Sequence, residues 1–557
     1  MERIWLKSYP EGIPADIDLN QYQSLVDIFE DCVKRFADNT AFISLGVKLT
    51  YRELDKYTRD FAAWLQNQGV KPGSRVALMM PNILQYPICL FGALRAGCVA
   101  VNFNPMYTSH EVEKQLNDSG AEVIVVVENF AATLQAALPN TPTIKKVVVC
   151  SIGGMLGAKG KIVNFVIRHV KGMVPNWHIP HHIRMNTVFE EGSKSIFTPL
   201  KLTHDHHAFL QYTGGTTGIP KGAILTHGNI VANVLQANAW VRAYTTEGKD
   251  LIITALPLYH IFALTANCLT FMCLGASNLL IINPRDLKGF VKEIAQYKFT
   301  AFTGVNTLFN ALINNHDFKK IDFSSLKLTL GGGMAVQQNT ADKWKALTGV
   351  PLAQAYGLTE TSPAATINPL DAQEFNGSIG LPIPSTYVKI VDDHGQELPL
   401  NEVGEILIKG PQVMKGYWER PEETSNVFDA DGYLCTGDMG YMNEDGYVFL
   451  VDRKKDLIIV SGFNVYPNEV EDVAAKHPGV LEVAAIGIDN GAAGELVKLF
   501  VIRKDPNLTE EEIINHCRAE LTNYKVPKKI AFVNDLPKNN VGKILRRELR
   551  NKKSNYV

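Results

Sequence analysis

The chain of 557 residues is too long for a single hydrophobic core, and we expect two or more domains. Apolar residues make up 46% of the sequence and charged residues 20%, which is typical of a soluble globular protein. The formal net charge of -2 argues against a nucleic-acid-binding protein that acts through a broad basic surface, so we expect no nucleic-acid partner.

The cysteines and the N-terminus both favour a cytoplasmic protein. None of the eight cysteines forms a CxxC pair, which favours scattered, reduced thiols over a disulfide framework or a zinc site. The N-terminal residues contain no apolar signal-peptide core before Pro10 and Pro14.

Short apolar runs alternate with amphipathic segments along most of the chain. We expect strands at 75–80, 121–127, 299–305 and 326–330, and helices at 51–68 and 83–96. This alternation predicts an α/β fold, with a large N-terminal domain of mixed or parallel sheets and helices.

Residues 151–182 contain no acidic residue, and their apolar side chains recur at roughly helical spacing. The basic residues Lys159, Lys161, Arg168 and Lys171 lie among them, and Trp177 follows. Such a segment can lie on anionic lipid, here at the cytoplasmic face of the inner membrane. It can equally be an ordinary surface helix that packs on its own domain, and both interpretations stay open.

Residues 251–282 are almost free of charge, which raises the question of a membrane span. Pro257 interrupts the stretch early, His260 lies inside it, and Gly275 ends its helical part. The roughly 15 helical residues that remain are fewer than the ~20 that cross a bilayer. We therefore expect a buried strand, a loop and a core helix.

The pattern changes after residue 379 to hairpin-like runs with Asp/Gly turns at 392–395, 431–432 and 445–446. We expect a β-rich subdomain over about 380–452, at the end of a large N-terminal domain of residues 1–452. The charged string 452–456 (DRKKD) is the candidate hinge to a small, mobile C-terminal α/β domain of residues 453–557.

The string YTGGTTGIPKG at 212–222 carries the strongest chemical signal. Its glycines let the backbone approach an anion closely, its threonines add hydroxyl donors, and Lys221 adds positive charge. The spacing differs from that of a Walker A loop. A polar surface turn is the alternative interpretation.

Three further strings are weaker when each is taken alone. YGLTE at 356–360 follows the glycines at 331–333 and combines an aromatic ring, a hydroxyl and a carboxylate that suits Mg²⁺, although a helix start explains it about as well. Asp438, in a TGD string upstream of Arg453, suits ribose hydroxyls or a β-turn. Lys543, in PKNNVGK, is either a mobile point charge or a solvated lysine.

Together and in this order, the four strings resemble the adenylate-forming superfamily of acyl-CoA synthetases, firefly luciferase and peptide-synthetase adenylation domains. The resemblance covers essentially the whole chain. It is closer still to bacterial long-chain fatty-acid–CoA ligases, through ALPLYHIFAL (255–264), GVNTLFNAL (304–312), GSIGLPIPST (377–386) and SGFNVYPNEVED (461–472). The sequence DGYLC before Thr436 departs from the usual long-chain signature and leaves the preferred chain length open.

The resemblance implies roles for the matching residues. Thr359 and Lys543 would act on the reacting groups, with Lys543 between the carboxylate and the α-phosphate. His260 would lie beside the acyl pocket, although a core histidine is the alternative. Glu360, with Thr213, would hold Mg²⁺, and Lys455 would be the hinge. The residues implied in ATP binding are Thr213, Gly214, Gly215, Thr216, Thr217, Gly218, Lys221, Gly331, Gly332, Gly333, Tyr356, Gly357, Thr359, Asp438 and Arg453.

The activity implied is ligation of a fatty acid to coenzyme A through an acyl-AMP, with ATP and CoA as co-substrates and Mg²⁺ as cofactor. Within the same fold, a fatty-acyl-AMP ligase that loads a carrier protein and a luciferase-like oxygenase are alternatives. A membrane-associated fatty-acid carrier is the alternative from another class. The oligomeric state stays open.

Overall fold

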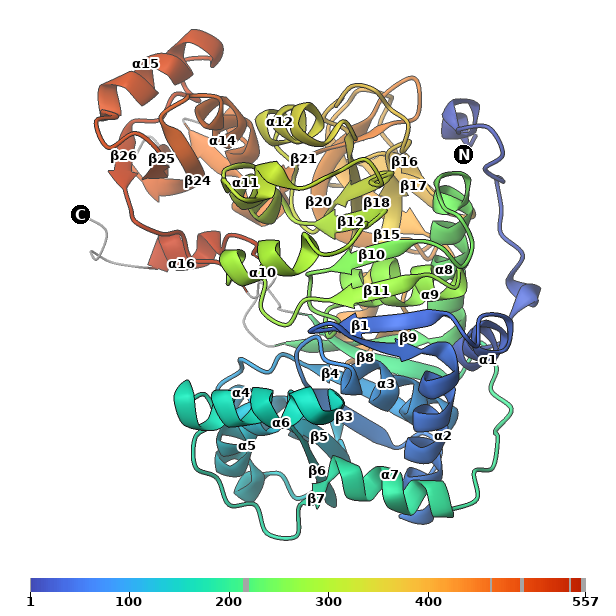
Figure 1. The fold of residues 1–557 in the computed structure, drawn as a ribbon. Helices are drawn as coiled ribbons and strands as arrows, with labels where there is room; N and C mark the ends of the chain where they lie inside the picture. Colours follow the sequence, from blue (N-terminus) through green and yellow to red (C-terminus); the bar gives the residue numbers. More distant parts are fainter. Residues whose placement is uncertain (1, 214–219, 461–462, 491–494, 540–541, 552–557) are drawn as a thin grey trace.

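The computed structural model describes residues 2–213, 220–460, 463–490, 495–539 and 542–551. Two large sheets form most of the molecule (Figure 1). The first sheet contains, in spatial order, β19 (Gly416–Tyr417), β9 (Lys221–Thr226), β8 (His207–Thr213), β4 (Val99–Phe103), β3 (Arg75–Met79), β5 (Val123–Val127), β6 (Lys146–Cys150) and β7 (Ile183–Arg184). The second contains β16 (Leu381–Pro382), β15 (Ala364–Ile367), β14 (Leu352–Gly357), β13 (Leu328–Gly331), β12 (Ala301–Gly304), β10 (Leu251–Thr254), β11 (Ser277–Leu280), β1 (Thr40–Ser44) and β2 (Val47–Thr50).

Three smaller sheets follow in the C-terminal part of the chain. A four-stranded antiparallel sheet contains β17 (Tyr387–Val391), β18 (Gly404–Lys409), β20 (Leu434–Met442) and β21 (Val448–Arg453). After it come the hairpin β22 (Ile458–Val460) and β23 (Phe463–Val465), and the three-stranded sheet of β24 (Val480–Asp489), β25 (Glu495–Arg503) and β26 (Lys529–Phe532).

The helices lie on both faces of the sheets. They are α1 (Leu25–Arg35), α2 (Tyr51–Asn67), α3 (Gln85–Arg95), α4 (Ser109–Ser119), α5 (Ala131–Ala137), α6 (Gly157–Phe165), α7 (Met185–Lys194), α8 (His227–Val241), α9 (Thr270–Cys273), α10 (Leu287–Ile294), α11 (Asn306–Ile313), α12 (Gln338–Thr348), α13 (Pro421–Ser425), α14 (Pro467–Ala475), α15 (Glu510–Glu520) and α16 (Arg546–Asn551). Complete capping boxes start several of them, as at Thr50 and Glu53 before α2, where side chain and backbone satisfy each other's free groups.

The two-residue period of the buried strands explains the layering. In β3, Val76 and Leu78 join the core between the two large sheets, whereas Ala77 and Met79 face α4 and α5. In β12, Ala301 faces the central core and Phe302 faces α10, α11 and α12. Strands that are buried on both faces read as continuous apolar runs, as β5 does.

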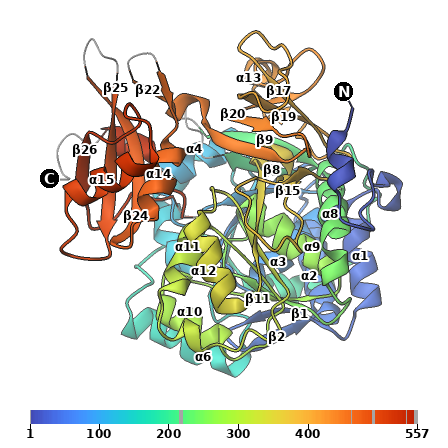
Figure 2. The same cartoon turned by 90° about the horizontal axis from the view of Figure 1, so that it is seen from above.

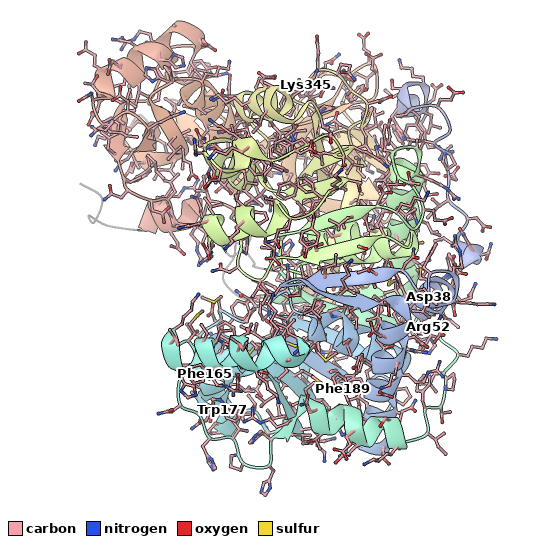
Figure 3. All side chains as sticks on the ribbon, viewed as in Figure 1. Asp38, Arg52, Phe165, Trp177, Phe189 and Lys345 are labelled. Atoms are coloured by element: carbon pink, nitrogen blue, oxygen red, sulfur yellow. The ribbon has the colours of Figure 1, made fainter. Side chains whose placement is uncertain are left out.

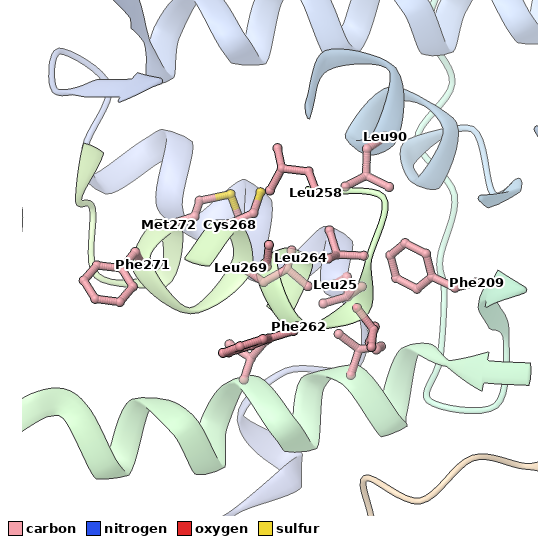
Figure 4. Packing of buried hydrophobic residues seen from close by; sticks show 14 of the residues in the cluster. Leu25, Leu90, Phe209, Leu258, Phe262, Leu264, Cys268, Leu269, Phe271 and Met272 are labelled. Atoms are coloured by element: carbon pink, nitrogen blue, oxygen red, sulfur yellow. The ribbon is translucent and has the colours of Figure 1, made fainter. Parts of the chain in front are cut away.

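The central core holds α1, α2, α3, α8 and α9 between the sheets. Figure 4 shows part of it: Leu264, Cys268 and Met272 pack among Leu25 of α1, Leu90 of α3 and Phe209 of β8. A separate pair of cores belongs to residues 458–549, where α14 and α15 cover one face of the β24–β26 sheet and α16 contributes to the other. Figure 2 shows this small unit beside α11 and α12.

The predicted α/β fold, with its large sheet-containing part and small C-terminal part, is confirmed. The strands and helices predicted before residue 331 are present with bounds that differ by at most two residues. The Asp/Gly turns are also present, because Gly395, Gly432 and Gly446 all adopt positive φ angles between paired segments. The boundary at residue 452 and the mobility of the small domain stay predictions.

The uncharged stretch of residues 251–282 folds as a strand, a loop and a buried helix, as predicted. Strand β10 leads to a π-helix, Ala263–Leu269, that continues into α9, and the stretch then adds the unpredicted strand β11. No helix among the described residues is long and apolar enough to cross a membrane. All eight cysteines are free thiols, and only Cys435 is not buried.

Candidate active site

The glycine-rich string lies between two strands of the first large sheet. Thr213 ends β8 and Lys221 begins β9, and the two residues are register partners across this antiparallel pair. Of the residues implied in ATP binding, Gly214, Gly215, Thr216, Thr217 and Gly218 lie outside the described residues. The two strands therefore hold Thr213 and Lys221 side by side.

Lys221 and Glu360 meet through a tyrosine that the sequence analysis did not single out. The ammonium of Lys221 lies 5.1 Å from the ring centroid of Tyr417 in β19. The hydroxyl of Tyr417 donates to Oε1 of Glu360 at 2.7 Å. The other carboxylate oxygen of Glu360 has no hydrogen-bond or ion-pair partner among the described residues, which leaves it for another ligand. One carboxylate beside phosphate oxygens is the kind of ligand set that Mg²⁺ takes, so Glu360 fits the implied metal.

A buried carboxylate organises the next group. Asp438 in β20 is 2% exposed, and its Oδ2 accepts a hydrogen bond from the hydroxyl of Tyr356 at 2.6 Å. Its Oδ1 pairs with Nε of Arg453 at 2.7 Å, across the β20–β21 register. Burial raises the pKa of the Tyr356 hydroxyl, and the adjacent Asp438 charge raises it further, so Tyr356 stays a neutral donor.

YGLTE joins these two groups because it spans the end of β14 and the short 3-10 turn Thr359–Thr361 that follows. Gly357 packs so closely that an added Cβ would lie 1.8 Å from the carbonyl oxygen of Pro363, so no larger residue fits there. Tyr356 thus reaches the Asp438 group while Glu360 reaches Tyr417.

The three-glycine string lies on the neighbouring strand. Gly331 ends β13, and Gly333 has a φ of +77° that favours glycine. A Cβ on Gly332 would stand 3.1 Å from the ring of Phe262 and 3.2 Å from the carbonyl oxygen of Ala355. The glycines therefore let Phe262 and the end of β14 pack directly against the backbone that follows β13.

Lys543 comes to the same place from the far end of the chain. Its loop is closed by the bridge between Lys538 and Ile544 and by hydrogen bonds between Asn539 and the backbone of Lys543. Gly542, with a φ of +87°, lies against Val305 and Thr307, and the Thr307 hydroxyl donates to the Gly542 carbonyl at 3.3 Å.

The charge of Lys543 is unfavourable in this setting. Burial and, after it, repulsion from Arg453 together lower the pKa of Lys543 to about 8, while Asp438 opposes the shift. Burial also lowers the pKa of His260 to about 4, with a contribution from the nearby Lys543, so that His260 is neutral. A site with this excess of positive charge is suited to an anion.

The hinge candidate adjoins this group. Lys455 lies in the short turn Lys454–Asp456 directly after Arg453, and burial lowers its pKa, with Arg453 the next cause. Just beyond, Arg546 of α16 pairs with Asp452 at 3.3 Å and with Glu471 at 2.9 Å. Arg546 therefore ties the helix that follows Lys543 to the strand that precedes the hinge.

The structure thus brings Tyr356, Asp438, Arg453, Lys455 and Lys543 together, with His260 close to Lys543. It joins Thr213, Lys221 and Glu360 to them through YGLTE and Tyr417. Sequence reasoning missed Tyr417, Phe262, Thr307 and Arg546. Arg546 follows Lys543 by only three residues, and this position could have identified it as a residue near the site. The roles assigned to these residues stay predictions.

Two large sheets, a β-rich unit and a C-terminal unit that places a lysine beside a buried Asp–Arg pair define an adenylate-forming enzyme. The chain belongs to the AMP-binding enzyme family, whose model matches residues 29–418, and the model of the AMP-binding enzyme C-terminal domain matches residues 469–543.

Similar proteins cover almost the whole chain. A long-chain-fatty-acid–CoA ligase of Escherichia coli O6:H1 is 54% identical over 99% of this chain and 98% of its own length. One of Haemophilus influenzae is 51% identical with the same shares. The crystal structure of an anthranilate CoA ligase in complex with anthranoyl-AMP has a TM-score of 0.85 and 26% identity, and the match covers 96% of this chain and 98% of that one.

Proposed function

We propose that this protein is a fatty-acid–CoA ligase that converts fatty acid, ATP and coenzyme A to acyl-CoA, AMP and pyrophosphate through an acyl-AMP, with long-chain acids as substrates. The observation that carries the proposal is the position of Lys543 beside the Asp438–Arg453 pair. The identity of 54% with a long-chain ligase over the full length supports the reaction and its substrate class.

In the first half-reaction, a carboxylate oxygen of the fatty acid forms a bond to the α-phosphorus of ATP, and pyrophosphate leaves. The barrier comes from bringing two anions together and from the negative charge around phosphorus. Lys543 offsets both charges at the carboxylate and α-phosphate, and Thr359 contacts the α-phosphate. Thr213 and Lys221 hold the other phosphates, while Asp438 and Arg453 hold the ribose.

Mg²⁺, held by Glu360 with Thr213, supplies charge neutralisation on the phosphate oxygens when it is bound. The glycines at 331–333 and the Tyr356 ring flank the adenine. His260 is neutral beside Lys543 and therefore adds no competing charge where the carboxylate enters. No protein nucleophile is needed, because the carboxylate itself attacks.

In the second half-reaction, the thiol sulfur of coenzyme A bonds to the acyl carbon and AMP leaves with the electron pair of the broken bond. Lys543 occupies the place beside the reacting atoms, so we propose that the domain of residues 453–557 swings about Lys455 against residues 1–452. Thr307 and Gly542 then separate, and the thiol gains access. By alternating between two orientations of the small domain, the enzyme would carry out both half-reactions at one site.

The alternatives fit less well. A fatty-acyl-AMP ligase has no support among these similar proteins, and a carrier that binds ATP without chemistry leaves Lys543 without a role. We also propose that the enzyme works in the cytoplasm and meets its substrate as a peripheral protein at the inner membrane surface.

The test is incubation of the purified protein with ATP, Mg²⁺, coenzyme A and fatty acids of graded length, with thioesters identified by mass spectrometry. We expect acyl-CoA and equimolar AMP, and pyrophosphate exchange that depends on the fatty acid when coenzyme A is left out. Absence of both products with every acid would contradict the proposed function.

A further inference from the structure

Residues 157–170 of the basic segment 151–182 fold as a continuous helix. Helix α6 continues into the π-helix Val166–Val170. Its inner face is tightly held: a Cβ on Gly160 would lie 1.9 Å from the carbonyl oxygen of Gly153, and Asn164 accepts from the backbone of Gly153 at 2.8 Å and donates to the Ser151 hydroxyl at 3.0 Å. The inner face of the helix therefore makes the contacts that hold it to the rest of the protein, and the outer face is not needed for them.

Large apolar side chains project from the opposite face. Ile162 is 67% exposed, Phe165 59%, Val170 69% and Met173 50%. Residues 162–173 thus hold four of the eleven large apolar side chains that are exposed in the described part of the chain. A surface helix that only covers its own core places polar residues outward, so this face differs from the ordinary pattern.

Figure 3 shows Phe165 and Trp177 on the same side of the molecule. Trp177 is half-buried, with its ring edge-on to His182 and 5.1 Å from the Arg184 guanidinium. Trp and Tyr are common where a protein meets lipid headgroups, because the ring is apolar and its N–H or O–H is polar. The apolar face thus has an aromatic neighbour of the kind found at a membrane–water boundary.

The charged residues of this segment itself all have one sign. The chain has no acidic residue from Ser151 to Phe189. Arg168 is occupied by Glu128, at 3.0 and 2.7 Å, but Lys161 and Lys171 are exposed and have no ion-pair partner among the described residues. A second copy seated on this face would bring these like charges together, whereas an anionic lipid surface complements them.

We propose that the α6 surface, formed by Ile162, Phe165, Val170 and Met173 with Lys161 and Lys171, docks on an anionic lipid bilayer. The apolar side chains enter the boundary between headgroups and acyl chains, and the two lysines lie at the headgroups. This would be the surface by which the proposed ligase meets fatty acid in the bilayer. Only this use of the surface, and not lipid binding itself, rests on the proposed function.

The test is co-sedimentation of the full chain with phosphatidylcholine vesicles with and without phosphatidylglycerol, at low and high salt. We expect binding only to the anionic vesicles and weaker binding at high salt. K161Q/K171Q should lower the partition coefficient roughly 30-fold, because each lysine near such a surface contributes about 1 kcal/mol. I162S/F165S should lower it by roughly tenfold or more.

Matched controls lie elsewhere on the surface. Ile196→Ser removes an apolar side chain that is 89% exposed, and K249Q/K319Q removes two exposed lysines without ion-pair partners among the described residues. These variants should bind as the unchanged chain does. Absence of binding to anionic vesicles at low salt, or equal losses in α6 and control variants, would overturn the proposal.

Two further readouts distinguish lipid docking from self-association and from a loss of catalysis. Sedimentation velocity would assign the face to a second copy if I162S/F165S abolished self-association and left vesicle binding unchanged, which also overturns the proposal. Ligation of fatty acid delivered from anionic vesicles should slow in I162S/F165S, while ligation of the same acid delivered on albumin should not. If no preparation forms acyl-CoA but vesicle binding responds as expected, the proposed function fails and the surface stands.

Discussion

Replacement of Lys543 by alanine separates the two half-reactions. The pKa of Lys543 falls from 10.5 to about 8, so the nucleotide-free site disfavours the protonated amine by at most about 3 kcal/mol. An anion at the site reverses this penalty, and loss of one preorganised group aimed at developing charge costs about 100- to 1,000-fold in rate. We therefore expect Lys543→Ala to slow acyl-AMP formation by about that factor.

The assay measures the two steps apart. Fatty-acid-dependent exchange of pyrophosphate into ATP, without coenzyme A, reports the first step, and thioester formation from supplied acyl-AMP reports the second. The second should change little in Lys543→Ala, and Lys529→Ala, an exposed lysine of β26, is the matched control for both. Equal losses in the two steps would refute the assignment of Lys543 to adenylation.

Three further predictions concern the same site. Because Lys543 acts in its protonated form, kcat/KM for acyl-AMP formation should fall tenfold per pH unit above about pH 8. Lys543→Arg should abolish this decline, since a guanidinium stays charged. A decline that persists in Lys543→Arg would belong to another group. Asp438→Asn should raise the KM for ATP and lower the melting temperature. Arg453 loses its charged partner at 2.7 Å, and a hydrogen bond to a charged group contributes about 2 kcal/mol to stability. An unchanged KM for ATP would exclude Asp438 from the ribose site. Lys455→Pro fixes one backbone angle at the hinge and should retain acyl-AMP formation while slowing thioester formation at least tenfold, whereas unchanged rates for both steps would exclude Lys455 as the hinge.

The sequence predicted the parts of the fold that depend on local patterns. Apolar runs such as β5 and the Asp/Gly turns at Gly395 and Gly446 carry their own signal, because side-chain period and backbone angle are local properties. Strand β11 was missed, since its four residues, SNLL, are too few to show a two-residue period and two of them are polar.

Contacts between remote strands were beyond such reasoning. Tyr417 reaches Glu360 only because β19 pairs with β9, a pairing between residues about two hundred positions apart. Phe262 covers Gly332 because the π-helix after His260 turns it toward β13. The motif residues were recognisable because their chemistry is unusual in itself, whereas Tyr417 and Phe262 gain meaning only from their neighbours.

For the proposed swing of the small domain, the forces on that domain predict that a bound nucleotide decides its orientation. Four hydrogen bonds among the described residues join α11, the adjacent Asn314 and α12 to it, from Thr307 to Gly542, from Asn310 to Leu481, from Lys504 to Asn314 and from Asn339 to Ala475. Each contributes only about 0.5–1.5 kcal/mol net, since water satisfies the same groups when the domains part. Burial of protonated Lys543, with repulsion from Arg453, opposes them. The phosphates and carboxylate that remove the lysine penalty therefore favour this orientation, and loss of pyrophosphate weakens that preference when the thiol needs access.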